Sequence, residues 1–340
     1  MIKLLLLNMD TAENYTRTTN LTHTFANVSE HDCRLYPGED VKCLTLKYSK
    51  LSSSMLSIAG SLLTLGIVVL FKKYKEFTQR MIANLSLASM LVGISYLLDE
   101  FEEHASPLCM LQGALMTFSI WSNMMWIVCI IANLYRRVIV GVDWRRKEIL
   151  ITVTCWTIPL IMMSLPFVGD MYGPAGVWCW IKNDVAWRFG IWYIWNILSI
   201  VVFFFVMVHI VYTLLKAVNE QRSDLGVLRV QTLHADIRIL RMYPVVYFVV
   251  NIFPIIGRIQ DALYGYSFEV LLLQTLFGPL HGAAIALVFV LDRKTAKLLN
   301  VKDLRKAVGN WRKSKTQIQE YQHGREFSRN VPCVETESSF

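Results

Sequence analysis

The stretch Trp178-Cys179-Trp180-Ile181, followed by Trp187-Arg188-Phe189-Gly190-Ile191-Trp192-Tyr193, decides how this chain is organised. Long apolar runs flank it, so we expect a loop that dips toward a membrane between two spanning helices. Cys109 lies at the start of a long uncharged run, 110–135, and is the partner we expect for Cys179. A bridge between them would tie the loop, as a lid, to the outer end of that helix. The rings of Trp178 and Trp180 suit the membrane–water interface.

The composition indicates a membrane protein. Hydrophobic residues make up 54% of the 340 residues and occur in blocks rather than in periodic stripes. The net charge of +8 is carried by basic residues in the connectors beside the apolar blocks, so we expect no nucleic-acid partner. The 7 cysteines form no C-x-x-C pair, which disfavours a zinc site, and we expect neither a metal nor a cofactor.

Seven nearly uncharged segments are each long enough to cross a hydrocarbon core about 30 Å thick. They are residues 50–71, 81–101, 109–135, 148–168, 188–215, 241–262 and 268–291. Lysine and arginine cluster after the first, third, fifth and seventh segments and are scarce in the other connectors. The positive-inside rule then places the N-terminus outside and the C-terminus in the cytoplasm. We therefore predict an all-α, seven-transmembrane-helix bundle.

Residues 1–48 form a polar tail ahead of the predicted transmembrane domain, 49–292. Three glycosylation sequons begin at Asn14, Asn20 and Asn27, and their clustering favours an extracellular tail. In that oxidising space Cys33 and Cys43 can close a small loop, with two separate thiols as an equal alternative.

The chain after the last span is predicted to form an amphipathic helix over 293–315 and a disordered tail over 316–340. Apolar residues recur there at steps of three and four, at Leu298, Val301, Leu304, Val308 and Trp311. The basic residues between them would meet anionic lipid headgroups, with a plain solvated helix as the alternative. The terminal Ser338-Ser339-Phe340 weakly fits a PDZ-domain ligand, and an arrestin is a second candidate partner of this tail.

Charged residues near the outer ends of the spans mark a candidate ligand site, because charges are costly in a membrane. They are Asp99 and Glu100 in the second span, Arg188 in the fifth, and Arg258 and Asp261 in the sixth. Arg188 and Arg258 would present fork donors to an anionic group. The alternatives are an intrahelical pair between Arg258 and Asp261, and an interfacial place for the two acids of the second span.

The inner end of the third span reads Asn133-Leu134-Tyr135-Arg136-Arg137. Arginines at a helix C-terminus first of all compensate the helix dipole and reach lipid headgroups. A second interpretation makes Tyr135, Arg136 and Arg137 a latch whose release opens a groove for a partner helix. His209 and His281 are isolated, so we expect hydrogen-bonded structural histidines, no catalytic set and no enzyme.

Several short motifs in the spans resemble those of one receptor family. They are Leu111-Gln112-Gly113-Ala114-Leu115, Trp178-Cys179-Trp180-Ile181, Arg188-Phe189-Gly190 with Tyr193, Arg258-Ile259 and His281-Gly282. Over about 50–292 the chain resembles the cyclic-AMP-receptor-like (class E) G-protein-coupled receptors, including their animal orphan relatives. The resemblance implies a plasma-membrane receptor, a heterotrimeric G protein as partner and an extracellular small-molecule ligand, cyclic AMP in the founding receptors. Arg188 and Arg258 match the family's arginines by position within these motifs. We predict a ligand-binding set of Arg188, Arg258, Trp180, Tyr193 and Asp99.

Two other classes of protein compete with this interpretation. A Trp-Cys-Trp loop is also similar to secretin and adhesion receptors, which would imply a peptide ligand. A seven-helix transporter or channel would need a charged path, yet the middles of the first, third, fourth and seventh spans hold no Asp, Glu, Lys or Arg. The Asp-Arg-Tyr and Asn-Pro-x-x-Tyr motifs of rhodopsin-like receptors are absent from the expected places.

Overall fold

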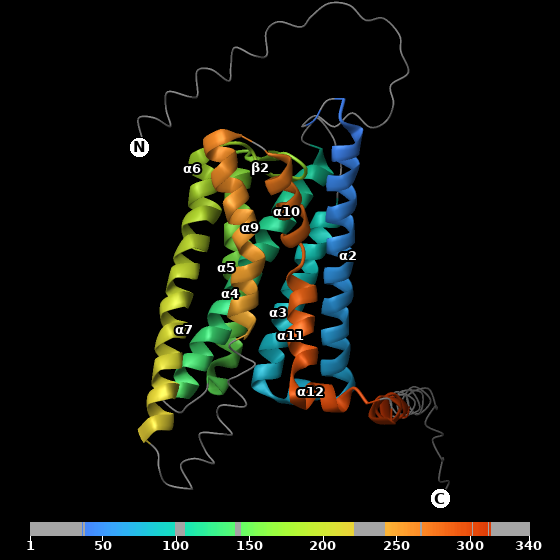
Figure 1. The fold of residues 1–340 in the computed structure, drawn as a ribbon, viewed down its shortest axis with the longest axis vertical. Helices are drawn as coiled ribbons and strands as arrows, with labels where there is room; N and C mark the ends of the chain where they lie inside the picture. Colours follow the sequence, from blue (N-terminus) through green and yellow to red (C-terminus); the bar gives the residue numbers. More distant parts are fainter. Residues whose placement is uncertain are drawn as a thin grey trace, which may run out of the picture.

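The computed structural model describes residues 36, 38–98, 106–139, 144–220, 242–265, 267–300, 302–311 and 313. Long helices run side by side along one axis (Figure 1). They are α2 (Asp40–Leu70), α3 (Phe77–Leu97), α4 (Pro107–Ile139), α5 (Glu148–Val168), α7 (Ile194–Glu220), α9 (Met242–Tyr264), α10 (Phe268–Phe277) and α11 (His281–Leu291). The shorter elements are η2 (Lys73–Lys75), η3 (Arg145–Lys147), α6 (Val185–Arg188), η4 (Phe189–Tyr193) and α12 (Arg293–Leu298), with strands β1 (Tyr172–Pro174) and β2 (Cys179–Ile181).

Among the described residues, 6 helices are long and apolar enough to cross a membrane, and the bent pair α10–α11 makes up to 7. Each predicted span corresponds to one of them. The first helix begins at Asp40 rather than at residue 50. Residues 40–48 were predicted as part of the polar tail, but a helix can continue past the bilayer where its residues favour helix. The sequons at Asn14, Asn20 and Asn27 lie outside the described residues.

The segment predicted as one span over 268–291 is two helices bent by 50° at a break. Pro279 lies in the break; it has no backbone N–H and its ring clashes with the preceding turn. Two side chains satisfy backbone groups beside it. His281 Nδ1 lies 2.9 Å from the carbonyl of Gly278, and Ser57 Oγ accepts the N–H of Gly282 at 2.8 Å. Such partners are what a membrane-buried helix break requires.

Glycines bring α2 and α11 into backbone contact. A Cβ atom on Gly60 would lie 2.8 Å from the Cα of Ala283, and one on Gly282 would overlap Ser57 and Ser61. Small residues at a helix contact let the backbones approach closely, which is the usual basis of helix packing in membranes. The lower half of the broken helix is thereby held against α2.

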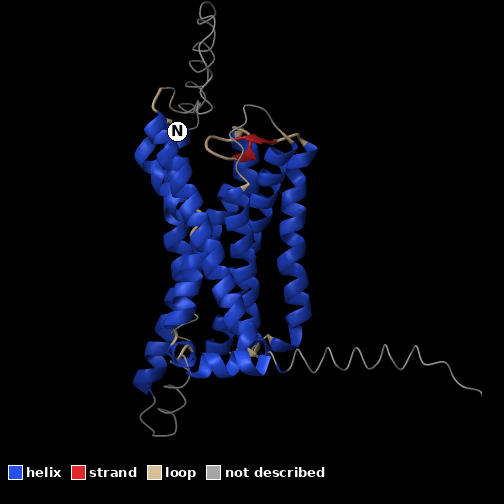
Figure 2. Ribbon diagram, turned by 90° about the vertical axis from the view of Figure 1, so that its right-hand side faces the viewer, coloured by secondary structure: helices blue, strands red, loops and turns tan. Residues whose placement is uncertain are grey.

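The strands lie at one end of the bundle, and α12 runs across the opposite end (Figures 1 and 2). Beneath the strands, Trp178 and Trp180 are only 4% and 3% exposed and pack in a buried cluster with Tyr96 and Met116. The prediction that both rings lie at the membrane–water interface is therefore wrong. The hairpin directs the rings of Trp178 and Trp180 toward the interior of the bundle, because burial of the apolar indole surface is favourable.

The helix predicted over 293–315 is divided in the structure. α12 ends at Leu298, and residues 302–311 are helical again. Leu304 and Trp311, on the predicted apolar face, are 37% and 46% exposed. The positions beyond 313, including the predicted tail, lie outside the described residues.

Candidate functional site

A two-stranded hairpin forms a lid at one end of the bundle (Figure 2). β1 and β2 pair antiparallel, with Tyr172 opposite Ile181 and Pro174 opposite Cys179. Cys179 forms a disulfide with Cys109 of α4, the pair singled out in the sequence. Tyr172 donates its hydroxyl to the carbonyl of Met163 at 2.9 Å. Burial raises the pKa of Tyr172 to about 12, so the phenol stays neutral and keeps this donor role.

The lid packs against the Leu-Gln-Gly motif of α4, residues 111–113. Gln112 is fully buried; its Nε2 donates to the carbonyl of Ser95 at 3.1 Å and its Oε1 accepts the N–H of Cys179 at 2.9 Å. Gly113 leaves room for the lid, because a Cβ there would lie 2.7 Å from the ring of Tyr172. One turn on, Thr117 accepts the indole N–H of Trp180 at 3.2 Å. The motif therefore joins α3, α4 and the lid.

Arg188 contributes to the lid and does not line the cavity beneath it. The side chain is 3% exposed, and its Nε donates to the carbonyl of Ile181 at 3.1 Å. Its Nη1 donates to Asn183 Oδ1 at 3.0 Å, and the guanidinium lies 5.8 Å from the ring centroid of Trp180. This arginine fastens the end of the hairpin to the start of the next helix.

A cavity lies under the lid between α3, α4, α9, α10 and α11. Its lining includes Tyr96, Trp178, Trp180, Arg258, Gln274 and His281. The guanidinium of Arg258 is 5.2 Å from the ring centroids of both Trp178 and Trp180. Arg258 is 5% exposed, so these cation–π contacts are largely shielded from water. In this packing the free space is about 40 Å³, enough for a few ordered waters.

The deep wall of the cavity is polar. His281 Nε2 lies 3.1 Å from Asn251 Nδ2, and its Nδ1 lies 2.9 Å from the carbonyl of Gly278. A carbonyl only accepts, so Nδ1 carries the proton and Nε2 accepts from the amide of Asn251. The neutral histidine is thus a hydrogen-bonded structural residue, as predicted, and it also faces the cavity.

The predicted ligand residues are only partly brought together. Trp180 and Arg258 line the cavity, whereas Tyr193 packs against Phe189 and Trp192 with ring centroids 5.0 and 5.1 Å apart. Asp99, Glu100 and the side chain of Asp261 lie outside the described residues, as does Cys33. Cys43, its predicted partner, is disulfide-bonded.

Sequence reasoning missed three residues of this end of the bundle. Lys50 is 2% exposed and donates to the carbonyl of Val177 in the lid at 2.7 Å. Asn251 and Gln274 line the cavity and are 4% and 5% exposed. Amides carry no charge and so do not stand out in an apolar span, and Lys50 is the first residue of the predicted span 50–71. Polar side chains of every kind inside the spans were the signal that would have found them.

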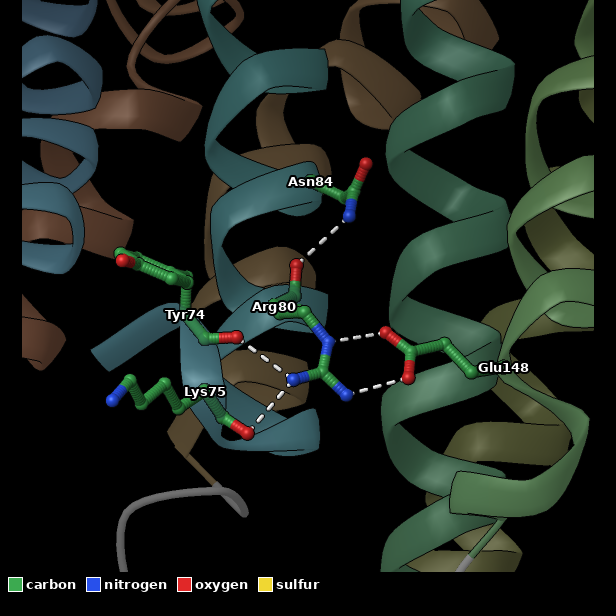
Figure 3. Close-up of polar contacts among 5 residues, drawn as sticks. All are labelled: Tyr74, Lys75, Arg80, Asn84 and Glu148. Carbon is green, nitrogen blue, oxygen red and sulfur yellow. Dashed lines mark hydrogen bonds and ion pairs between the residues drawn. The ribbon is translucent and has the colours of Figure 1, made fainter. Parts of the chain in front are cut away.

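At the opposite end, Arg80 joins three segments of the chain (Figure 3). Its guanidinium forms a two-bonded ion pair with the carboxylate of Glu148, at the start of α5. Its Nη1 also donates to the carbonyls of Tyr74 and Lys75, at 2.8 and 2.9 Å. Asn84, one turn along α3, accepts the indole N–H of Trp156 at 3.3 Å. We call the contacts of Arg80 and Glu148 the Arg80 clamp.

The predicted coupling residues, Tyr135, Arg136 and Arg137, lie near the end of α4 on the same side as the Arg80 clamp and are partly buried. Arg136 lies 5.7 Å from the ring centroid of Trp144, and Tyr135 lies 5.6 Å from the ring of His209. In the part of the chain that the structure describes, no group of three or more His, Cys, Asp or Glu is arranged to hold a metal ion.

Comparison with known proteins assigns the family. The family described as slime mold cyclic AMP receptor matches residues 42–325. Cyclic AMP receptor-like protein A of Dictyostelium discoideum is 26% identical over 243 residues, covering 70% of this chain and 62% of that protein. Human G-protein coupled receptor 157 is 30% identical over 206 residues, covering 56% of this chain and 60% of that protein.

A third relative, cyclic AMP receptor 4 of Dictyostelium discoideum, is 26% identical over 265 residues, covering 73% of this chain and 57% of that protein. The chain thus spans about three fifths of the length of the curated relatives it matches. Because the family match extends over most of the chain and the helices suit a membrane, the chain belongs to the slime mold cyclic AMP receptor family, a family of multi-pass membrane receptors.

Proposed function

We propose that this protein is a G-protein-coupled receptor of the plasma membrane that transmits an extracellular signal to a heterotrimeric G protein. The names of its relatives, cyclic AMP receptors and G-protein coupled receptor 157, support this assignment. The charge bias of the connectors supports an extracellular N-terminal tail, 1–48, and a cytoplasmic C-terminus. In that orientation the lid faces outward, and the Arg80 clamp, Tyr135, Arg136 and Arg137 face the cytoplasm.

The ligand site is the cavity under the lid, and the position of Arg258 between two indoles is the observation that carries this proposal. A buried arginine that lines the same cavity as Gln274 and Asn251 offers an anionic ligand a charge-assisted fork, with neutral hydrogen-bonding groups in the same cavity. The ligand is a cyclic nucleotide or another small anion. Trp178 and Trp180 supply flat apolar surface for a ring of such a ligand.

Ligand entry requires the lid or α9 to move. Sites for drug-sized molecules occupy roughly 300–1,000 Å³, far more than the few waters this packing accommodates. An anion that takes over Arg258 weakens its contacts with Trp178 and Trp180 and therefore favours a different packing of α9 against the lid. Pro254 lies one turn from Arg258 on α9 and removes one backbone hydrogen bond, which makes this helix the element best suited to bend.

The cytoplasmic consequence is an opening of α7 and α9, into which a helix of the G protein docks beside Tyr135, Arg136 and Arg137. The basic helix after α12 rests on the inner leaflet, where its lysines and arginines meet anionic headgroups. The proposed organisation also includes glycans at Asn14, Asn20 and Asn27 and a Cys33–Cys43 bridge. An arrestin or a PDZ domain is a candidate partner of the C-terminal tail.

G-protein dissociation in cells that express the full chain tests the coupling. Each main Gα class is measured without ligand and with extracellular cyclic nucleotides, beside an Arg136→Ala/Arg137→Ala variant. The proposal predicts a signal with at least one Gα class that falls in the variant at equal surface level. Surface-expressed protein that activates no Gα class under any of these conditions would overturn the coupling.

A further inference from the structure

Two cysteines inside the bundle face one another. The Sγ atoms of Cys129 in α4 and Cys155 in α5 lie 3.0 Å apart, and neither cysteine is in a disulfide. Both are buried, with 9% and 0% of their surface exposed, and both helices are candidate membrane spans. We propose that Cys129 and Cys155 form a second, reversible disulfide of this protein, within the membrane-spanning part of the bundle.

The distance between the sulfurs distinguishes a disulfide from a metal site. Two thiolates bound to one tetrahedral metal at about 2.3 Å each lie about 3.8 Å apart. The observed 3.0 Å is too short for that, and no third cysteine, histidine or carboxylate completes a ligand set among the described residues. A bond of about 2.05 Å needs the sulfurs to approach by only about 1 Å.

Neighbouring contacts hold the two helices so that the sulfurs stay opposed. Trp156, next to Cys155, donates to Asn84 of α3 at 3.3 Å and stacks on Phe118 of α4 with ring centroids 5.8 Å apart. Its ring also meets Trp126 of α4 at 6.1 Å. These contacts fix the rotation of α5 about its axis. The Cys155 thiol also makes a long polar contact, at 3.8 Å, with the carbonyl of Met125.

The position of the pair selects the class of oxidant. A buried thiol in an apolar environment is shielded from aqueous oxidants. A lipid hydroperoxide, in contrast, shares the hydrocarbon region with α4 and α5. We therefore name a lipid hydroperoxide as the co-reactant.

The reaction takes place in two steps. One thiol sulfur attacks the outer oxygen of the hydroperoxide: the S–O bond forms, the O–O bond breaks, and the thiol proton passes to the departing oxygen, giving a sulfenic acid and a lipid alcohol. The second thiol attacks the sulfenic sulfur: the S–S bond forms and water leaves with the second thiol's proton. Two thiols are oxidised and one hydroperoxide is reduced. A membrane-permeant dithiol reverses the bond by exchange.

The test uses the full chain in lipid nanodiscs treated with cumene hydroperoxide, an apolar organic hydroperoxide. Remaining thiols are alkylated after denaturation, and the non-reduced digest is analysed by mass spectrometry. We expect a peptide linked through Cys129 and Cys155, about 2 Da lighter than the sum of its two parts, with a matching loss of alkylation at both positions. A dithiol should restore both thiols.

Met55 provides an internal measure of dose, because it is 59% exposed on α2 and oxidises to the sulfoxide. Full alkylation of both cysteines at a dose that oxidises Met55 would overturn the proposal, as would separate sulfinic acids without the linked peptide. Cys129→Ser should remove the linked peptide and leave Cys155 as a sulfenic acid or a free thiol. The wild-type digest decides the outcome even if that variant does not fold.

Discussion

The side-chain oxygen of Gln112 accepts the backbone N–H of Cys179 at 2.9 Å, directly beside the disulfide that joins the same two segments. Replacing Gln112 with Met keeps the side-chain length and leaves a buried N–H without its acceptor, which costs about 1–3 kcal/mol. We expect Gln112→Met to lower the thermal midpoint of the protein in nanodiscs. An unchanged midpoint would mean that the disulfide alone holds the lid.

Gly113 allows the lid to seat closely on α4. In Gly113→Ala the new methyl group would lie 2.7 Å from the ring of Tyr172, so the lid must shift. We expect lower stability, with a cost of about 1–3 kcal/mol. Gly190→Ala is the matched control, because nothing lies within 4 Å of a Cβ there. Equal thermal midpoints for the two variants would contradict the seating role of Gly113.

The backbone contact between α2 and α11 is tested by a similar pair of variants. Gly282→Ala would press its Cβ against the backbone oxygen of Ser57 and the hydroxyl of Ser61, so we expect poor folding and low surface level. Gly66→Ala, on the same helix as Ser57, meets open space, and gains about 0.5–1 kcal/mol from helix propensity. Flow cytometry of both variants checks this, and normal expression of Gly282→Ala would refute the close contact.

Part of this architecture was readable from the sequence. Length and apolarity located the spans, because any segment that crosses a bilayer must be long and apolar whatever its neighbours are. The Cys109–Cys179 pair was readable because each cysteine lay at a predicted outer helix end or loop. Pro279 is a sign of the break in the last span. The continuous apolar character of 268–291 nevertheless predicts a single helix.

The rotation of each helix was not readable, because it depends on partners far away in the chain. Arg188 and Arg258 look equivalent in the sequence. In the structure Arg188 donates to the backbone of the lid, whereas Arg258 lines the cavity. The close packing of the lid on α4 depends in the same way on the space that Gly113 leaves beside the ring of Tyr172 and the backbone of Trp180. Depth in the membrane follows from local composition, whereas side-chain partners follow from packing.

The Arg80 clamp should contribute more to stability than an exposed ion pair. Arg80 and Glu148 are 29% and 28% exposed and form a two-bonded pair, whereas Lys182 and Asp170 are 40% and 84% exposed. A double-mutant cycle with Arg80→Ala and Glu148→Ala should give a coupling energy of about 0.5–3 kcal/mol. The same cycle on Lys182 and Asp170 should give about 0–1 kcal/mol.

Arg80→Lys is the sharper variant of the clamp, because lysine keeps the charge and loses the fork. We expect it to recover only part of the stability lost in Arg80→Ala. Full recovery would show that charge alone is sufficient and that the bonds to the carbonyls of Tyr74 and Lys75 contribute little.

The most direct test of the proposed receptor is the response of Arg258→Ala to extracellular cyclic nucleotide, measured as G-protein dissociation at matched surface levels. Loss of a charge-assisted contact of about 1.5–3 kcal/mol should shift the half-maximal concentration by about 10- to 100-fold. Lys182→Ala, on the exposed side of the lid, should respond as the wild type does. A wild-type response that Arg258→Ala retains unchanged would contradict the site, and a silent wild type would contradict a cyclic nucleotide as the ligand.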